Sequence, residues 1–186
     1  DAGYIDALVQ SVRRHWMSNG HPDKVLMSFH GMPERTAKLG DPYQAQCLAT
    51  ADLLALRLGL KKEDYLVTFQ SRFGKATWLQ PYTEPSLREL GKKGVARVDV
   101  LCPGFVSDCI ETLEEIAMEG KEAFMESGGQ DFHYIPCLND RLDWVRALRQ
   151  IVTQHLQGWP TLADQQPSAD ELHARRQRAK DTGAKA

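Results

Sequence analysis

Residues 24–33 are Lys24-Val25-Leu26-Met27-Ser28-Phe29-His30-Gly31-Met32-Pro33, an apolar run that ends in a histidine and a Gly/Pro turn. An apolar run of this kind is typical of a strand that is covered on both faces of a sheet. Gly31 and Pro33 favour a tight turn, which lets a ligand approach the backbone closely. The segment therefore predicts a buried strand with His30 at its carboxyl end.

The same order of strand, loop and helix repeats along the chain. Strands are predicted at residues 25–29, 65–69, 95–102 and 131–136, and helices at about 42–59, 84–92, 107–126 and 140–157. Ser107 and Asn139 are plausible N-caps of the last two helices. Alternating strands and helices predict the α/β class, here a three-layer, Rossmann-like domain with a four-stranded parallel sheet flanked by helices.

Polar side chains follow each predicted strand at its carboxyl end. Parallel sheets bind their ligands at this edge, so the side chains that meet there are candidates for a site. The first strand is followed by His30 and the second by Gln70 and Ser71, while the third and fourth are followed by Ser107, Asp108, Glu111 and Asn139.

An acidic row follows the third strand. Asp108, Glu111, Glu115, Glu119 and Glu122 recur at intervals of three or four residues, so they share one face of a helix. A solvated face is the ordinary explanation of such a row. The alternative is a ligand site, because the row begins at the binding edge. Asp108 and Glu111 are the best candidates for that site, Glu115 is a possible extension of it, and Glu119 and Glu122 fit the surface better.

His30 also has two interpretations. A histidine at a strand end is often only hydrogen-bonded structure, but imidazole is also the side chain best suited to exchange protons near neutral pH. Together with one or two carboxylates it makes a mixed nitrogen and oxygen site that suits Fe²⁺, Zn²⁺, Co²⁺ or Mn²⁺. The other five histidines lack such flanking residues and are interpreted as structural or exposed: His15, His21, His133, His155 and His173.

The longest predicted loop, residues 70–82, is rich in aromatic residues. Phe73, Trp78, Leu79 and Tyr82 offer a large apolar surface there. One interpretation is a small hydrophobic cluster of the loop itself. The other is a wall for a large flat ligand, which stacks well on such side chains.

Composition excludes several classes of protein. The chain has 186 residues, 42% apolar and 26% charged, with a net charge of −2, so no global field attracts nucleic acid. No apolar run approaches the ~20 residues that span a bilayer. The four cysteines form no CxxC pair, and buried free thiols are the simplest explanation. No GxGxxG, P-loop or nucleophile-elbow motif is present.

Three regions are expected along the chain. Residues 1–20 form an amphipathic helix or linker, with Ile5, Leu8, Val12 and Trp16 on one side. Residues 21–160 form the Rossmann-like domain. Residues 161–186 form a polar tail, either solvated or frayed, in which a small basic cluster makes nucleic-acid binding a remote alternative.

At its motifs the chain resembles the ferrochelatase family, in particular its proteobacterial members. The motifs come in the family's order and cover most of residues 4–157. They are Ser28-Phe29-His30-Gly31-Met32-Pro33, Gly40-Asp41-Pro42-Tyr43, Phe69-Gln70-Ser71-Arg72-Phe73-Gly74, Trp78-Leu79-Gln80-Pro81-Tyr82-Thr83 and residues 102–113, Cys102-Pro103-Gly104-Phe105-Val106-Ser107-Asp108-Cys109-Ile110-Glu111-Thr112-Leu113.

The resemblance implies a type II chelatase fold with two Rossmann-like halves, of which this chain is the C-terminal one. It implies insertion of Fe²⁺ into protoporphyrin IX to form protohaem, the final step of haem biosynthesis. His30 matches the family's invariant histidine, as proton acceptor, metal ligand or both, and Glu111 its essential glutamate, as partner ligand or proton relay. Asp108 and Glu115 match the supporting acidic row, on a helix that usually contains a π-type turn. Gln70, Ser71 and Trp78 match positions near the porphyrin cleft.

Further expectations follow from the resemblance. No permanently bound cofactor is expected, and no iron–sulfur cluster, because no cysteine follows Cys137. Cys109 stands where several members have histidine, which makes a ligand role there doubtful. The expected partners are porphyrin, Fe²⁺ and the N-terminal half of the same enzyme, with peripheral membrane contact possible and a cytoplasmic location. The alternatives are a chelatase that inserts cobalt or nickel, and a non-catalytic half-domain that holds metal or haem.

Overall fold

The computed structural model describes residues 1–159 and 166–183. The chain divides into two compact units, Asp1–Ala147 and Leu148–Ala186. The first unit contains the sheet and every predicted site residue. The helix α7, Leu142–His155, begins in the first unit, and α8, Ala169–Asp181, belongs to the second.

The first unit is built on a four-stranded sheet in which all neighbouring strands are parallel. The strand order is β2-β1-β3-β4. The strands are β1 (Lys24–His30), β2 (Tyr65–Gln70), β3 (Arg97–Leu101) and β4 (Asp131–Tyr134). The predicted fold class is therefore confirmed. The five middle residues of β1 are buried, as expected of a strand with both faces covered.

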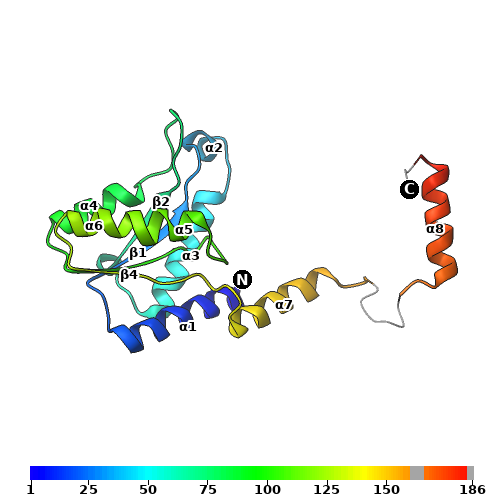
Figure 1. The fold of residues 1–186 in the computed structure, drawn as a ribbon, viewed down its shortest axis with the longest axis horizontal. Helices are drawn as coiled ribbons and strands as arrows, with labels where there is room; N and C mark the ends of the chain where they lie inside the picture. The colour runs from blue at the N-terminus through cyan, green and yellow to red at the C-terminus, as the bar shows by residue number, and fades with distance from the viewer. Residues whose placement is uncertain (160–165, 184–186) are drawn as a thin grey trace. The chain divides into compact units, whose positions relative to one another are not determined.

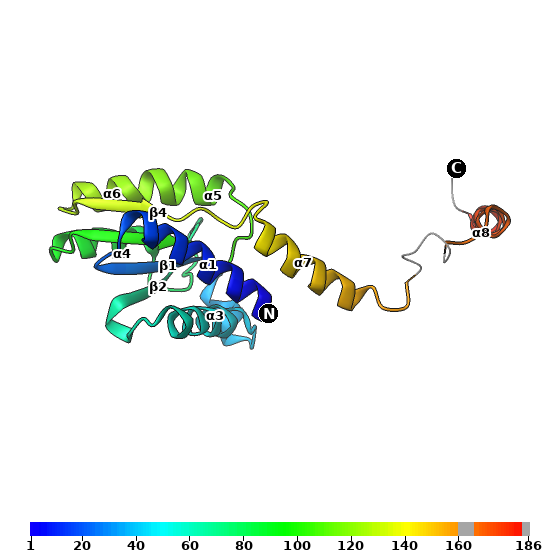
Figure 2. The ribbon, with the colours of Figure 1, turned by 90° about the horizontal axis from the view of Figure 1, so that it is seen from below.

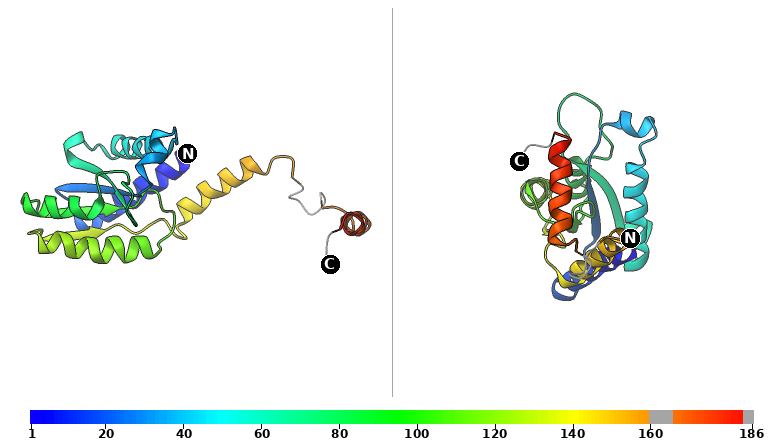
Figure 3. Two further views of the ribbon diagram at one scale, coloured as in Figure 1. Left: turned by 90° about the horizontal axis from the view of Figure 1, so that it is seen from above. Right: turned by 90° about the vertical axis from the view of Figure 1, so that its right-hand side faces the viewer.

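Helices cover both faces of this sheet (Figures 1 and 2). One face packs on α4 (Thr83–Lys92) and α6 (Lys121–Glu126), where Leu87 and Phe124 pack with Val98 and Val100 of β3. The other face packs on α3 (Tyr43–Leu58), which lies opposite α4 and α6 in Figure 3. The short elements α2 (Glu34–Lys38) and η1 (Lys62–Asp64, a 3₁₀ turn) stand before α3 and β2.

Helix α1 (Ala2–Asn19) is the predicted amphipathic helix. Its apolar side, with Ile5, Leu8, Val12 and Trp16, is buried. The Trp16 indole N–H donates to Asp99 of β3 across 3.0 Å. Because Asp99 alternates with Val98 and Val100, α1 lies on the face opposite α4 and α6.

The predicted helix 107–126 is divided into three parts. The elements are α5 (Ile110–Leu113), a π-helical turn η2 (Glu115–Gly120) and α6. The π-type turn that the resemblance implied is thus present. The predicted N-caps were wrong: Cys109 is the N-cap of α5, and Asn139 has a left-handed φ of 48° and binds Asp108 instead of capping a helix.

Part of the predicted polar tail is helical. Ser168 caps α8 through a reciprocal capping box with Glu171, and no residue of α8 is buried. The expectations for residues 160–165 and 184–186 lie outside the described residues. Across residues 1–159 and 166–183, no helix combines the length and apolar character needed to cross a membrane.

Candidate active site

The strand order reverses direction at β1, since the chain passes from β1 to β2 on one side and then returns to β3 on the other. Ligands of open α/β sheets bind at such a switch point, beyond the carboxyl ends of the strands. His30 ends β1 at this point and pairs in register with Gln70 at the end of β2. The segment that follows β3, with Asp108 and Glu111, flanks the same edge.

The ring of His30 is held in one tautomer. Its Nδ1 lies 2.7 Å from the carbonyl oxygen of Gly31. A carbonyl only accepts, so Nδ1 carries the hydrogen and Nε2 of the neutral ring is left bare. The rings of Trp78 and Phe105 are its aromatic neighbours, each with its centroid 6.3 Å from that of His30. A fixed ring with a bare Nε2 is prepared to take a proton or to bind a cation.

Gln70 ties the strand ends to the acidic helix. Its side chain is buried and its amide donates to the carbonyl of Glu111 across 2.6 Å. Its amide oxygen accepts from Ser28 across 2.7 Å, and Ser28 in turn contacts Thr83 at 2.8 Å. The side chains of Gln70, Ser28 and Thr83 thus form a buried series of hydrogen bonds in which each polar group has a partner. Through this series Gln70 positions the helix that carries Glu111.

Ser71 holds the next glutamate. Its backbone N–H and its hydroxyl both donate to the Glu115 carboxylate, each across 2.6 Å. Ser71 adopts a left-handed φ of 62°, which is rare for a residue with a Cβ. The two hydrogen bonds hold this conformation and fix the start of η2 against the end of β2.

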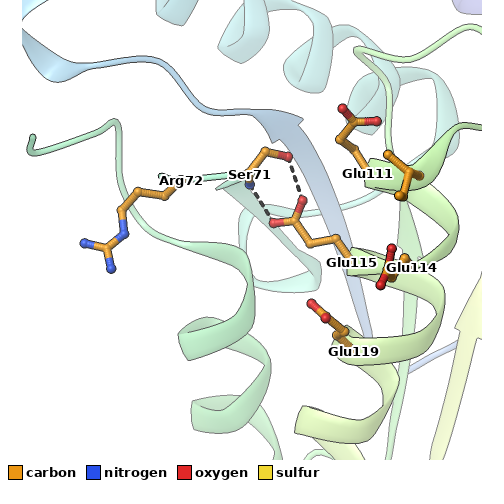
Figure 4. A pocket seen from close by; sticks show the side chains of 7 residues that line it. Ser71, Arg72, Glu111, Glu114, Glu115 and Glu119 are labelled. Atoms are coloured by element: carbon orange, nitrogen blue, oxygen red, sulfur yellow. Dashed lines mark hydrogen bonds between the residues drawn. The ribbon is translucent and has the colours of Figure 1, made fainter. Parts of the chain in front are cut away.

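These residues line a surface cavity of about 370 Å³. Figure 4 shows Glu111, Glu115 and Glu119 one after another along the helix, with Ser71 bonded to the middle one, Glu115, and Arg72 pointing away from the row. In the wider π-helical turn, residues four apart lie on nearly the same side of the helix. Glu119 therefore faces the same way as Glu115 and Glu111. Four carboxylates against one guanidinium make the cavity attractive to cations. The lining residues are Ser71, Arg72, Ile110, Glu111, Glu114, Glu115 and Glu119.

Glu111 is held ionised. A hydrogen bond from the Cys109 thiol lowers the pKa of Glu111, helped by its own backbone N–H and, when the His30 ring is protonated, by the positive charge of that ring. Burial raises the pKa of the Cys109 thiol, and so does its bond to Glu111, so the thiol stays protonated as the donor. A carboxylate with a lowered pKa is a weak base and a good cation ligand.

Asp108 is directed elsewhere. Its carboxylate accepts from Tyr134 Oη at 2.6 Å, from Asn139 Nδ2 at 2.7 Å and from the N–H of Cys137 at 3.2 Å. Burial by itself would raise the pKa of Asp108, but these hydrogen bonds outweigh it and lower the pKa. Asp108 does not line the cavity. It joins the loop after β3 to the segment after β4.

Trp78 is buried, with 6% of its surface exposed. It packs on the backbone of Gly31, where an added Cβ would lie 3.0 Å from the Trp78 ring and 2.8 Å from the carbonyl oxygen of Gln70. Phe73, 75% exposed, meets Trp78 edge-on with 5.0 Å between ring centroids. The loop therefore contains a hydrophobic cluster under the His30 turn, and Phe73 is its exposed aromatic face.

The structure brings Glu111, Glu115 and Ser71 into one cavity lining, with Gln70 behind it. His30 stands at the adjoining strand end. Sequence reasoning left out Arg72, Glu114 and Ile110, and it assigned Glu119 to the surface. Glu119 is exposed, but it also lines the cavity. Its i+4 spacing from Glu115 was the available signal, whereas nothing in the pattern distinguished Arg72.

Comparisons with known proteins show the family of the chain. The family model described as Ferrochelatase matches residues 1–156. The chain is 58% identical over its full length to a ferrochelatase of Methylibium petroleiphilum, and covers 51% of that relative. It is 56% identical over 98% of its length to one of Aromatoleum aromaticum, covering 49%, and 60% identical over 86% to one of Herminiimonas arsenicoxydans, covering 43%. The chain thus spans about half the length of the curated relatives it matches.

Proposed function

The chain belongs to the ferrochelatase family, and from this premise we propose that its protein inserts Fe²⁺ into protoporphyrin IX, releasing two protons and forming protohaem. The relatives are about twice as long as this chain. We therefore propose that these residues supply one wall of the active site, and that the other half of the same polypeptide supplies the second wall.

The observation that carries the proposal is a fixed, bare imidazole nitrogen at a strand end that adjoins a cavity lined by a row of carboxylates. His30 Nε2 is free because Nδ1 donates to Gly31. Metallation has to remove two protons from pyrrole nitrogens and deliver a divalent cation to them. The proposal assigns the protons to a base, His30, and the cation to weaker bases, the glutamates of the cavity.

Glu111 is the proposed partner ligand for Fe²⁺. Its lowered pKa favours the carboxylate over the acid at neutral pH. Glu115 is held by Ser71 and Gln70 and supports the row behind Glu111. Asp108, although it belongs to the same acidic segment, acts in this proposal only by holding the loop that presents Glu111.

The macrocycle is proposed to lie against the exposed face of Phe73, with Trp78 beneath it and Gln70 and Ser71 at its edge. A flat tetrapyrrole stacks well on aromatic side chains. No permanently bound cofactor and no iron–sulfur cluster enter this scheme, in which Fe²⁺ and porphyrin are both substrates. A cytoplasmic location, with the porphyrin collected at a membrane surface, fits an apolar substrate of this size.

The test is anaerobic metallation of protoporphyrin IX, followed by absorbance, with the complete enzyme carrying His30→Ala. Removal of a general base lowers turnover by about 10²–10⁴-fold, and His155→Ala serves as the matched control because His155 is exposed and distant in sequence. Near-normal turnover of His30→Ala contradicts the proposal.

Faster insertion of Co²⁺ or Ni²⁺ than of Fe²⁺ in the same assay would favour the alternative chelatase. If the isolated 186 residues metallate porphyrin as fast as the complete enzyme, the half-site part of the proposal is wrong.

A further inference from the structure

A second cluster of metal-ligating side chains lies on the other face of the sheet. His15 of α1, Asp99 of β3 and His133 of β4 each present one ligand atom, and these atoms lie within 4.8 Å of one another. Asp99 and His133 are register partners on adjacent parallel strands, so their side chains share one face. None of the three belongs to the cavity of the candidate active site.

The spacing of the ligand atoms matches a tetrahedral metal. His15 Nε2 lies 3.2 Å from His133 Nδ1 and 3.4 Å from Asp99 Oδ2. Zinc–nitrogen and zinc–oxygen bonds of about 2.0–2.2 Å give a tetrahedron with edges of about 3.4 Å. Two of the three separations therefore match the edges of such a tetrahedron, and the third is at most 4.8 Å.

The neighbours of the cluster hold its members in the required states. His133 Nε2 lies 2.9 Å from Asp131 Oδ1 and donates to it, which leaves Nδ1 of the neutral ring bare toward His15. This carboxylate–histidine pair is the usual support of a metal-bound imidazole.

Asp99 is fully buried and braced for the same role. Arg97 Nε donates to its Oδ1 across 3.0 Å, and its Oδ2 accepts from Trp16 Nε1 across 3.0 Å and from Arg97 Nη2 across 3.3 Å. Ligating carboxylates are commonly hydrogen-bonded in this way. Two carboxylates, Asp99 and Asp131, outnumber the one guanidinium of Arg97, so the cluster keeps a negative charge for a cation.

Without a metal, the close approach of the three ligand atoms depends on one hydrogen, the one on His15 Nε2. His15 Nε2 faces two acceptors, His133 Nδ1 and Asp99 Oδ2, so a single hydrogen on Nε2 lies where a cation would lie. When a cation replaces it, that hydrogen moves to His15 Nδ1. The exposed Asn19 amide lies beside this nitrogen, with its Nδ2 3.4 Å from Nδ1 and 2.9 Å from the carbonyl oxygen of His15, to which it donates.

We propose that His15, Asp99 and His133 form a three-ligand site for a divalent cation of the zinc type, which links α1 to β3 and β4. His15 also lines a cavity of about 380 Å³ together with Ser11 and Cys137, so one of the three ligands adjoins open space. The site goes beyond the proposed function and does not depend on it.

The test counts the Zn²⁺ bound by the full-length protein in equilibrium dialysis. The wild-type protein binds one more Zn²⁺ than His133→Ala. The same extra ion is kept in Glu111→Gln, which separates this site from the candidate active site. His173→Ala, an exposed histidine of α8, is the matched control and binds as the wild type does.

A second variant keeps the test decisive where His133→Ala does not fold. Asp131 is 50% exposed, so Asp131→Asn should fold, and loss of the supporting carboxylate weakens Zn²⁺ binding about 10–100-fold. Zn²⁺ also raises the melting temperature of the wild type, and this rise is smaller in Asp131→Asn. Equal Zn²⁺ stoichiometry and affinity in the wild type and in the folded variants would overturn the proposal.

Discussion

Asp108 and Glu111 lie three residues apart at the start of one helical segment, yet they serve two different parts of the molecule. Asp108 turns toward β4 and accepts hydrogen bonds from Tyr134, Asn139 and Cys137. Glu111 turns toward β2 and lines an open cavity. The pKa of both carboxyls is lowered, by hydrogen bonds in each case. A lowered pKa is therefore common to a carboxylate that holds a loop and to one that lines a cavity, and only the contacts of the two carboxylates distinguish them.

The sharpest test of this contrast is Glu111→Gln in the complete enzyme. We expect the rate of Fe²⁺ insertion to fall about 100-fold or more, the range of a lost acid–base or charge contribution, while the thermal stability stays unchanged because the side chain is exposed to the cavity. Glu122→Gln on α6 is the matched control, with the same chemistry on an exposed position outside the lining. Equal rates for the two variants would remove Glu111 from the site.

Asp108→Asn tests the opposite half of the contrast. Hydrogen bonds to a charged group contribute about 1.5–3 kcal/mol each, and the amide keeps only some of them, so we expect the free energy of unfolding to fall by about 2 kcal/mol in urea denaturation. Folded Asp108→Asn should retain most of its metallation rate. A stable but inactive variant would show that Asp108 takes part in the chemistry instead.

The pH dependence of stability follows from the lowered pKa of Asp108. Its contribution is fully present above the pKa of an unfolded aspartate, about 3.9, and is lost as the pH falls through the lower folded value. The difference in unfolding free energy between the wild type and Asp108→Asn should therefore be constant above about pH 5 and shrink below it. A difference that grows on acidification would contradict this assignment.

The smallest expected effect concerns Ser71, which joins the two regions at the end of β2. Both Ser71→Ala and Ser71→Gly lose the hydrogen bond from the Ser71 hydroxyl to Glu115. Alanine keeps the strained left-handed backbone, whereas glycine relieves that strain, which costs about 1–2 kcal/mol. The extra freedom of unfolded glycine offsets about 0.5–1 kcal/mol. Ser71→Gly should thus be more stable than Ser71→Ala by about 0.5–1 kcal/mol in the same denaturation assay. The reverse order would mean that the Ser71 backbone is not strained.

Much of the site was predictable from local pattern. The apolar runs located four strands to within a few residues, and polar residues after those strands marked the binding edge. The motifs around His30 and Glu111 were sufficient to indicate the family. The division of the acidic row was not predictable, because helical spacing places Asp108, Glu111 and Glu115 on one face and contains no information about Tyr134 or Ser71, which are distant in sequence.

The aromatic loop and the second histidine cluster illustrate the same limit. The aromatic residues of the loop suggested a surface that binds a flat ligand. Packing against Gly31 buries Trp78, however, and Phe73 is the aromatic ring that stays exposed. His15 and His133 have unremarkable flanks and are 118 positions apart, so only the parallel pairing of β3 with β4 and the docking of α1 bring them to Asp99.

By itself, the sequence determined the α/β class, the positions of the strands and the family, because periodicity and short motifs are local properties of the chain. Only the tertiary structure decided the strand order, the direction of each carboxylate and the meeting of His15, Asp99 and His133. These depend on contacts between distant segments, which form when both faces of the sheet are covered and buried polar groups find partners.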